Sequence, residues 1–517
     1  MLRAGRLARG STRYISSRSE VRNAAAVQGG GQNLKAPVLD ESSVNPRVLN
    51  AKYAVRGNVM AKAEMLKKRM ADGEKLPFTQ VVPCNIGNPH ALLQAPLTFH
   101  RQVLSVCLSP SLLEQEGVFP SDVADRASTY FAGMTGGMGA YTSSQGLLCV
   151  RQEVADFIQE RDGHPADPER IYLTNGASEG VRLFLTTLLR GSSSGDGMLT
   201  PIPQYPLYSA TMTLLGGELV PYYLDESEDW GVRLENLKES LAEARAQGTT
   251  VRAITVINPG NPTGNILTES DIRAIIQFAA EENLVILADE VYQSNIWAAD
   301  RPFLSFKKVA CDMGYTGEDG DERLQLVSFH STSKGFMGEC GLRGGYMELH
   351  GIGKEARGQL LKLCSLSLCS NVLGQLAMGL QVNPPKQGEA SFDTYQQERD
   401  AILASLKRRS NMVRQALVGL EGVTCNQAAG ALYAFPQLRF PAKAVQAAER
   451  EGVVVDEYYC LNLLEQTGII LVPGSGFGQE DGTFHFRTTF LPNEQQMPDV
   501  LDRLAKGHAA FMDEHRD

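Results

Sequence analysis

Hydrophobic and polar positions alternate in blocks between residues 170 and 350 of the chain. Short, nearly continuous apolar runs in "RIYLT", "VRAITVINP", "LVILADE" and "LQLVSFH" predict buried strands, because a strand that is covered on both faces has few polar positions. Amphipathic stretches separate these runs, and one of them, "LTESDIRAIIQFAAEEN", begins with Thr268 and carries Asp271 three residues later, which predicts a helix capping box. Strands that alternate with helices predict an α/β fold, in which helices cover both faces of a mostly parallel sheet.

A second, smaller domain is predicted after the polar, proline-containing stretch "QVNPPKQGEASF" at Gln381–Phe392. A long helical pattern follows this stretch, and then "GALYAFPQL", "GIILVPGSGFG" and "GTFHFRTTFLP" predict the strands of an α+β domain. We therefore expect an N-terminal arm that contributes to the small domain over residues 31–115, a large domain over residues 116–380, and the rest of the small domain over residues 381–517.

The composition narrows the class of protein. The chain has 517 residues, of which 43% are hydrophobic and 21% are charged, as in an ordinary soluble globular protein. No apolar run approaches the roughly 18 residues that a membrane-spanning helix needs. The formal net charge of −10 argues against a nucleic-acid partner, which would require a basic face. The nine cysteines form no C-x-x-C pair and the eight histidines form no H-E-x-x-H, so no metal site is predicted.

The first 23 residues, "MLRAGRLARGSTRYISSRSEVRN", differ from this average because they carry six arginines, four serines and Glu20 as their only acid. An N-terminus rich in arginine and serine and poor in acids is typical of mitochondrial and plastid transit peptides. A disordered basic tail is the alternative. We expect residues 1–30 to be a transit peptide and exclude them from the fold.

Small and polar residues lie where several of the predicted strands end. "TNGAS" (Thr174–Ser178) lies where a helix starts, so that its backbone N–H groups and the Ser178 hydroxyl either bind a phosphate or simply cap the helix. Asn261 of "NPGNPTG" lies in a turn after a buried strand, and Asp289 of "LADEVY" ends an apolar strand. A carboxylate at that position needs a partner or caps a helix. In open α/β sheets, ligands bind at these carboxyl ends of the strands.

One lysine, Lys334, stands among glycines and hydroxyls in "STSKGFMGECGLRGGY" (Ser331–Tyr346), directly after the strand "LQLVSF". Alone, this stretch predicts a surface loop with a solvated lysine. Together with the phosphate-binding turn and Asp289, it supports another interpretation, because a buried lysine amine can form a Schiff base with a carbonyl cofactor. Pyridoxal phosphate requires such a lysine, a phosphate cradle and an acid that faces its pyridine nitrogen, and the chain offers all three.

These motifs resemble those of the class I and II aminotransferases, which are pyridoxal phosphate-dependent transferases of fold type I. "NPGNPTG", "LADEVYQ" and "SFHSTSKGFMGECGLRGGY" occur in the order and spacing of that family, and the last motif is most similar to the alanine aminotransferases. The resemblance extends from about Asn45 to Pro492. It implies a large domain that binds the cofactor and a smaller α+β domain.

The resemblance also implies a role for each matching residue. Lys334 would form the Schiff base and move the proton at the substrate Cα, and Asp289 would pair with the pyridinium nitrogen. Tyr205 of "PQYPLY" would stack on the cofactor ring, whereas a core position for this lone tyrosine is the alternative. The ring hydroxyl would be bound by Asn261 and Tyr292. The phosphate would be held by Ala177, Ser178, Ser331, Ser333 and Arg343.

The substrate pocket implied by the resemblance is formed by Arg487, Gly87 and Asn261. Arg487 of "FHFRTTF" would bind the substrate α-carboxylate bidentately, whereas an arginine on a surface strand is the alternative. Tyr141 of "GAYTSSQG" would reach the phosphate in the neighbouring subunit, which implies a homodimer.

The activity implied by the resemblance is a reversible amino transfer from L-alanine to 2-oxoglutarate, which gives pyruvate and L-glutamate, so the expected partners are small amino and keto acids. Glutamate:glyoxylate aminotransferase, which has nearly the same motifs, is the alternative. That activity is peroxisomal in plant-type relatives, and the ending His515–Asp517 is not Ser-Lys-Leu, which favours alanine. We expect a mitochondrial protein, with a plastid or cytoplasmic location as the alternative.

Overall fold

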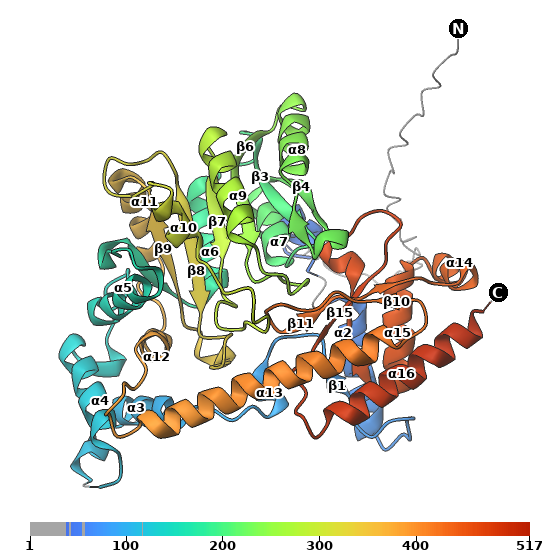
Figure 1. Cartoon of the computed structure of the whole chain (residues 1–517), viewed down its shortest axis with the longest axis horizontal. Helices are drawn as coiled ribbons and strands as arrows, with labels where there is room; N and C mark the ends of the chain where they lie inside the picture. Colours follow the sequence, from blue (N-terminus) through green and yellow to red (C-terminus); the bar gives the residue numbers. More distant parts are fainter. Residues whose placement is uncertain (1–37, 41–42, 54–56, 116, 517) are drawn as a thin grey trace, which may run out of the picture. The chain divides into compact units, whose positions relative to one another are not determined.

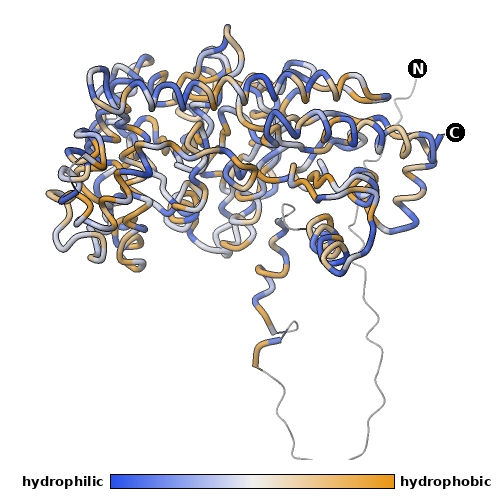
Figure 2. Tube along the Cα trace, turned by 90° about the horizontal axis from the view of Figure 1, so that it is seen from below, coloured by the Kyte–Doolittle hydropathy of each residue, from blue (hydrophilic) through white to orange (hydrophobic). Residues whose placement is uncertain are grey.

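The computed structural model describes residues 38–40, 43–53, 57–115 and 117–516, so the predicted transit peptide lies outside the described residues. Contacts divide the chain into the units Met1–Asn45 and Pro46–Asp517, and the helices and strands lie in the second unit. No helix in the described part is long and apolar enough to cross a membrane. Polar positions interrupt the apolar ones along the helices (Figure 2).

An eight-stranded sheet lies at the centre of the second unit (Figure 1). From one edge to the other, its strands are β2 (Ile171–Thr174), β9 (Gly345–His350), β8 (Leu326–Ser331), β7 (Val285–Asp289), β6 (Thr250–Ile257), β3 (Asp196–Ile202), β4 (Glu218–Asp225) and β5 (Gly231–Val232). The central neighbours from β8 to β4 pair in parallel, whereas β9 is antiparallel to both β2 and β8, and β5 is antiparallel to β4. The prediction of a mostly parallel sheet is confirmed.

Helices cover both faces of this sheet because successive strand residues point to opposite sides. Ile254 and Ile286 pack with one group of helices, and Ala253 and Leu287 pack with the other. The first group is α8 (Leu234–Ala246), α9 (Glu269–Glu281) and α10 (Phe306–Asp312), and the second is α6 (Ala177–Leu188), α7 (Leu207–Leu215) and α11 (Lys354–Ser365). The predicted capping box of Thr268 and Asp271 is present at the start of α9.

A third group of helices packs against β2 and β9 at one edge of the sheet. Their core contains Ile171 and Leu173 of β2 and Tyr346 of β9. The helices are α3 (Thr98–Leu108), α4 (Ser121–Gly133), α5 (Leu148–Asp162) and α12 (Val372–Val382). The 27-residue helix α13 (Phe392–Val418) then leads from α3 to the C-terminal part (Figure 1).

The C-terminal part has its own core, to which N-terminal residues such as Leu66 and Val82 contribute. Its helices are α2 (Asn58–Ala71), α14 (Ala442–Glu451), α15 (Val455–Thr467) and α16 (Met497–Glu514), while α1 (Pro46–Asn50) lies against α7. Its strands form a sheet β11 (Tyr433–Ala434), β15 (Phe486–Thr489), β14 (Val472–Pro473), and the pairs β1 (Val82–Pro83) with β13 (Ile469–Ile470) and β10 (Val423–Thr424) with β12 (Gln437–Leu438). Short strands therefore form in all three predicted segments. The domain boundaries near residues 115 and 380 stay predictions.

Candidate active site

A cavity of about 440 Å³ opens where the parallel strands β3, β6, β7 and β8 end. Every predicted site residue except Tyr141 lines this cavity. The structure brings together Gly87, Ala177, Ser178, Tyr205, Asn261, Asp289, Tyr292, Ser331, Ser333, Lys334, Arg343 and Arg487. Tyr141 lies outside it, is 77% exposed, and lines a separate hollow near α5.

Asp289 is the last residue of β7 and is only 5% exposed. Its Oδ2 accepts a hydrogen bond of 3.0 Å from the Tyr208 hydroxyl. Burial raises the pKa of the Asp289 carboxyl to about 6, although the hydrogen bond from Tyr208 opposes this effect. Turns follow β7, and the next described α-helix begins only at Phe306, so the alternative that Asp289 caps a helix is wrong.

Lys334 lies in the turn that follows β8. Its Nζ donates a hydrogen bond of 3.0 Å to the Gly87 carbonyl and lies 5.5 Å from the centroid of the Tyr292 ring. A Cβ atom at position 87 would lie 2.8 Å from this Nζ, so the glycine leaves the space that the amine occupies. Lys334 is therefore directed into the cavity and is not a solvated surface lysine.

The start of α6 and Arg343 form a site for an anion at one end of the cavity. The Arg343 backbone is in the left-handed region, with φ of 55°, and its Nη2 donates to the Asn175 carbonyl at 2.7 Å. A Cβ atom at Gly176 would lie 2.7 Å from the same Nη2, so only glycine allows this approach. The first N–H groups of a helix have no partner within the helix, and together with a guanidinium they favour a negative ligand such as phosphate.

Arg487 of β15 is 1% exposed, so the alternative of a surface arginine is wrong. Its Nη1 donates to Asn261 Oδ1 at 2.9 Å, and its Nη2 donates to the Asn85 carbonyl. The guanidinium carbon lies 4.2 Å from the Tyr433 ring centroid and 4.7 Å from that of Phe477. The Nε has no hydrogen-bond partner, and no carboxylate in the described residues pairs with the guanidinium. A buried charge of this kind calls for an anionic ligand.

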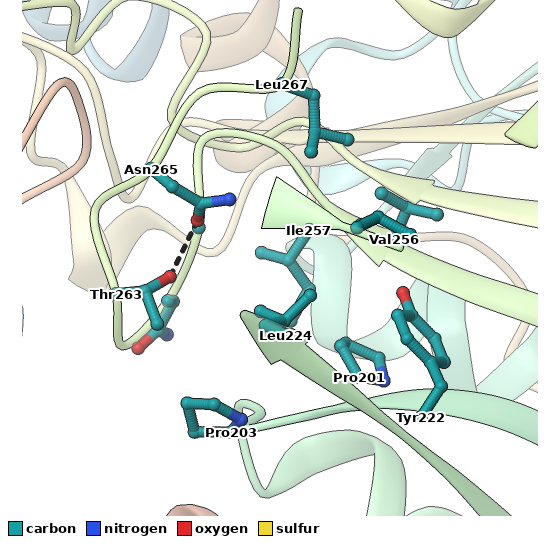
Figure 3. Close-up of a pocket in the computed structure, with 12 residues that line it drawn as sticks. Pro201, Pro203, Tyr222, Leu224, Val256, Ile257, Thr263, Asn265 and Leu267 are labelled. Atoms are coloured by element: carbon teal, nitrogen blue, oxygen red, sulfur yellow. Dashed lines mark hydrogen bonds between the residues drawn. The ribbon is translucent and has the colours of Figure 1, made fainter. Parts of the chain in front are cut away.

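Asn261 lies in the turn that follows β6, and side-chain hydrogen bonds hold this turn. Thr263 Oγ1 donates to Asn265 Oδ1 at 2.6 Å (Figure 3), and Asn265 Nδ2 donates to the Trp230 carbonyl at 2.8 Å. Asn258 Oδ1 also accepts from the backbone of Leu267 at 3.0 Å. These bonds fix the backbone that carries the Asn261 amide to the edge of the cavity.

The structure adds residues to the site that were not predicted from the sequence, among them Tyr53, Tyr208, Cys340 and Tyr433. Tyr53, Cys340 and Tyr433 line the cavity, and Tyr208 contacts it through Asp289. Tyr208 had a local signal, since it lies three residues after Tyr205 at the start of a helix. Tyr433 had none, because its place depends on the pairing of β11 with β15.

The residues of the cavity suit pyridoxal phosphate. An anion site lies at the start of α6, a buried carboxylate lies at the end of β7, and an amine lies in the turn after β8. These groups match the phosphate, the pyridine nitrogen and the carbonyl carbon of that cofactor. Arg487 is a further buried cation at the same cavity.

Comparisons with known proteins agree with this site. The family model for aminotransferase class I and II matches residues 109–504. The chain is 51% identical over 488 residues to glutamate–glyoxylate aminotransferase 2 of Arabidopsis thaliana, a match that covers 94% of this chain and 98% of that protein. It is 49% identical over 480 residues to the mitochondrial alanine aminotransferase 1 of the same plant, with 92% and 87% covered.

A solved structure of an alanine aminotransferase from Pyrococcus furiosus superposes with a TM-score of 0.71 over 91% of this chain and 100% of that one. At 24% identity, this similarity shows the fold. The motifs, the cavity and the relatives lead to one conclusion: the chain belongs to the class I and II aminotransferases and is a pyridoxal phosphate-dependent enzyme of fold type I.

Proposed function

We propose that this aminotransferase exchanges amino and keto groups between L-alanine and 2-oxoglutarate, giving pyruvate and L-glutamate. The observation that carries the proposal is the buried guanidinium of Arg487, which has no ion-pair partner among the described residues and lies in a cavity with neutral lining residues. These neutral residues include Tyr53, Ile86 and Leu207, and the only other cations among the described lining residues are Lys334 and Arg343. The single carboxylate and the methyl group of alanine and pyruvate fit these surroundings.

In this proposal, the substrate is held by groups that already face the cavity. Arg487 binds the α-carboxylate through its guanidinium, and Asn261 orients that guanidinium by its hydrogen bond of 2.9 Å. Gly87 leaves room for the Lys334 amine and the Tyr433 hydroxyl at the cavity, because a side chain there would collide with both. Tyr205 stacks on the cofactor ring, and Asn261 and Tyr292 bind the ring hydroxyl.

The chemistry is divided between the cofactor and two residues. Pyridoxal phosphate, when bound, supplies a carbonyl carbon that takes up an amino group and a ring that accepts electron density. Lys334 would hold the cofactor through its amine, and the same amine would move a proton at the substrate Cα. Asp289 keeps the pyridine nitrogen protonated, because a nearby negative charge stabilises the protonated form. The phosphate is bound by Ala177, Ser178, Ser331, Ser333 and Arg343.

The second candidate is glutamate:glyoxylate aminotransferase, which the 51% identity to a plant protein of that name favours. The two activities share glutamate and 2-oxoglutarate and differ in whether the smaller keto acid carries a methyl group. One methyl group is worth only about 1 to 3 kcal/mol in a fitted apolar pocket, so discrimination between pyruvate and glyoxylate would be modest.

We expect the purified enzyme to use alanine with 2-oxoglutarate better than glutamate with glyoxylate, because the apolar wall favours the methyl group. Coupled assays of both pairs, and of glutamate with pyruvate, under the same conditions measure kcat/KM for each substrate. A kcat/KM for glyoxylate roughly tenfold or more above that for pyruvate would establish the second candidate instead.

We also propose a homodimer in which Tyr141 reaches the phosphate of the neighbouring subunit. The exposed Tyr141 and Leu148 support it, because they lie at the two ends of one segment that Gln375 holds in place. Gln375 Nε2 donates to Thr142 Oγ1 at 3.0 Å, and Gln375 Oε1 accepts from the Leu147 N–H at 2.8 Å. Sedimentation of the purified protein tests this state, and a monomer at micromolar concentration would contradict it.

For the location we propose the mitochondrion, with a plastid or the cytoplasm as alternatives. The arginine-rich residues 1–30 and the mitochondrial names of three relatives support this proposal. A fluorescent protein fused behind residues 1–30 should enter mitochondria, and a fusion that remains cytosolic would contradict it.

Lys334→Ala should abolish turnover while the protein still binds pyridoxal phosphate at the anion site. Proton transfer by a positioned side chain alone is worth about 10² to 10⁴ in rate, and the covalent link is lost as well. Single-turnover kinetics and equilibrium binding measure the two effects separately. Lys362→Ala, at an exposed lysine of α11, is the matched control and should behave as the wild type. Undiminished turnover of Lys334→Ala would refute this role.

Tyr208→Phe should move the pH dependence of cofactor binding to higher pH. Burial already raises the pKa of Asp289 to about 6, and Tyr208 holds it down by hydrogen bonding to the carboxylate. The wild type should therefore lose affinity for pyridoxal phosphate as the pH falls through about 6, where the carboxyl takes up a proton. A hydrogen bond to a charged group is worth about 1.5 to 3 kcal/mol, so its loss should raise this midpoint by about one to two pH units.

The control for this variant is Tyr222→Phe, which removes a buried hydroxyl that donates to the Thr255 carbonyl at 2.8 Å. Equilibrium titrations with the cofactor between pH 5 and pH 8 give the midpoint for each protein. If Tyr208→Phe and Tyr222→Phe have the same midpoint as the wild type, Tyr208 does not tune Asp289.

A further inference from the structure

Tyr433 is a buried residue of the cavity that the proposed mechanism does not use. It lies on β11, is 2% exposed, and pairs with Thr489 of β15, the strand that also carries Arg487. Its neighbour at position 435, a phenylalanine, stacks on His485 and does not line the cavity. Tyr433 therefore brings a phenol into the active site from the C-terminal part of the chain.

The ring and the hydroxyl of Tyr433 contact different groups. The ring face lies 4.2 Å from the guanidinium carbon of Arg487, within the range of a cation–π interaction. The hydroxyl accepts a hydrogen bond of 3.1 Å from the Tyr292 hydroxyl, and the two rings meet edge to face at 5.9 Å. Tyr433 thus connects Arg487, which is proposed to bind the substrate carboxylate, with Tyr292, which is proposed to bind the ring hydroxyl of the cofactor.

The Tyr433 hydroxyl also lies close to the backbone that Lys334 contacts. A Cβ atom at Gly87 would lie 2.5 Å from this hydroxyl and 2.8 Å from Lys334 Nζ, so both groups face the same glycine. A phenylalanine would fill the space of the ring and pack on Arg487 equally well. The hydroxyl therefore needs an explanation other than packing.

The charges around the tyrosine pair make Tyr433 its more acidic member. Burial raises the pKa of the Tyr433 hydroxyl, but the positive charges of Lys334 and Arg487 outweigh burial and lower it below its usual value. Burial raises the pKa of Tyr292. The titratable and charged groups that face the pair are Lys334, Cys340, Arg487, Asp289 and Tyr205.

We propose that Tyr433 is a positioning residue with two separable functions: its ring holds the Arg487 guanidinium in place for the substrate carboxylate, and its hydroxyl supports the Tyr292 hydroxyl at the ring hydroxyl of the cofactor. The inference rests on the proposed function of the site. In the structure the Tyr292 hydroxyl donates to Tyr433. If the Tyr292 hydroxyl donates to the cofactor instead, it can accept a hydrogen bond from the Tyr433 hydroxyl, and hydrogen bonds in such a chain strengthen one another.

The test uses Tyr433→Phe, which removes only the hydroxyl, and Tyr433→Leu, which removes the ring as well. The same two substitutions at Tyr459, a buried tyrosine of the C-terminal core whose hydroxyl bonds to His508 at 3.0 Å, serve as controls. Propionate, a carboxylate that carries no amino group, is the probe for Arg487, and its dissociation constant is measured on the enzyme loaded with pyridoxal phosphate. The pH at which the bound cofactor changes its absorbance is the probe for Tyr292.

Tyr433→Leu should weaken propionate binding about tenfold, the loss of roughly one cation–π contact in a desolvated site. Tyr433→Phe should bind propionate within threefold of the wild type, yet its absorbance midpoint should rise by up to about one pH unit, as the loss of one hydrogen bond implies. The matched Tyr459 variants should change neither value. Propionate binding to Tyr433→Leu within twofold of the wild type would overturn the function of the ring, and an unmoved midpoint in Tyr433→Phe would overturn that of the hydroxyl.

Arg487→Ala separates this inference from the proposed function. If the wild type and Arg487→Ala bind propionate equally, the proposed role of Arg487 is wrong. If Arg487→Ala loses propionate binding while Tyr433→Leu keeps it, only the function of the Tyr433 ring is wrong. Circular dichroism shows whether Tyr433→Leu folds. If it does not, Tyr433→His replaces it, because histidine keeps an aromatic ring over Arg487 and removes the phenol. Tyr433→His should bind propionate as Tyr433→Phe does, and a tenfold loss of affinity would contradict the inference.

Discussion

Charged side chains that line the cavity without ion-pair partners are the constraint on which this active site depends. Asp289, the half-buried Lys334 and Arg487 line one cavity, and none of them takes part in an ion pair within the described residues. Asp289 accepts from the Tyr208 hydroxyl, Lys334 donates to a backbone carbonyl, and Arg487 donates to an asparagine oxygen and a second backbone carbonyl. An uncompensated charge in the interior is unfavourable, and its energy is recovered when a ligand of opposite charge binds. Pyridoxal phosphate and an amino-acid carboxylate together supply the missing charges.

The fold brings these charges together from two parts of the chain. Asp289 and Lys334 follow neighbouring parallel strands, β7 and β8, so the topology of the sheet alone brings them to one edge. Arg487 and Tyr433 come from the short antiparallel strands β15 and β11 of the C-terminal part. Asn261 joins the two sets, because it follows β6 and bonds to Arg487. The charged groups at the cavity thus come from two separate sheets.

The sequence predicted the residues whose surroundings are local. Lys334, Asp289 and Asn261 stand in motifs directly after apolar strands, and Thr268 with Asp271 defines its helix start by itself. Tyr433 was missed because both neighbours of the tyrosine in "ALYAF" are apolar and buried, so no alternation of polar and apolar residues shows which face of the strand it lies on. Its position also depends on the pairing of β11 with residues of β15, which lie more than fifty positions later in the chain. The partner of Asp289 was missed because a tyrosine in an amphipathic helix is usually a core residue.

The account is tested most directly by the stability of Asp289→Asn with and without the cofactor. A carboxyl whose pKa is raised by burial from 3.8 to about 6 destabilises the folded protein above that pKa, by up to about 3 kcal/mol at neutral pH. Without pyridoxal phosphate, the variant should therefore unfold at the same denaturant concentration as the wild type or at a higher one, and the stabilisation that the cofactor provides should shrink. A variant that is less stable without cofactor, but gains as much stability from it as the wild type, would show that Asp289 supports the fold and not the ligand.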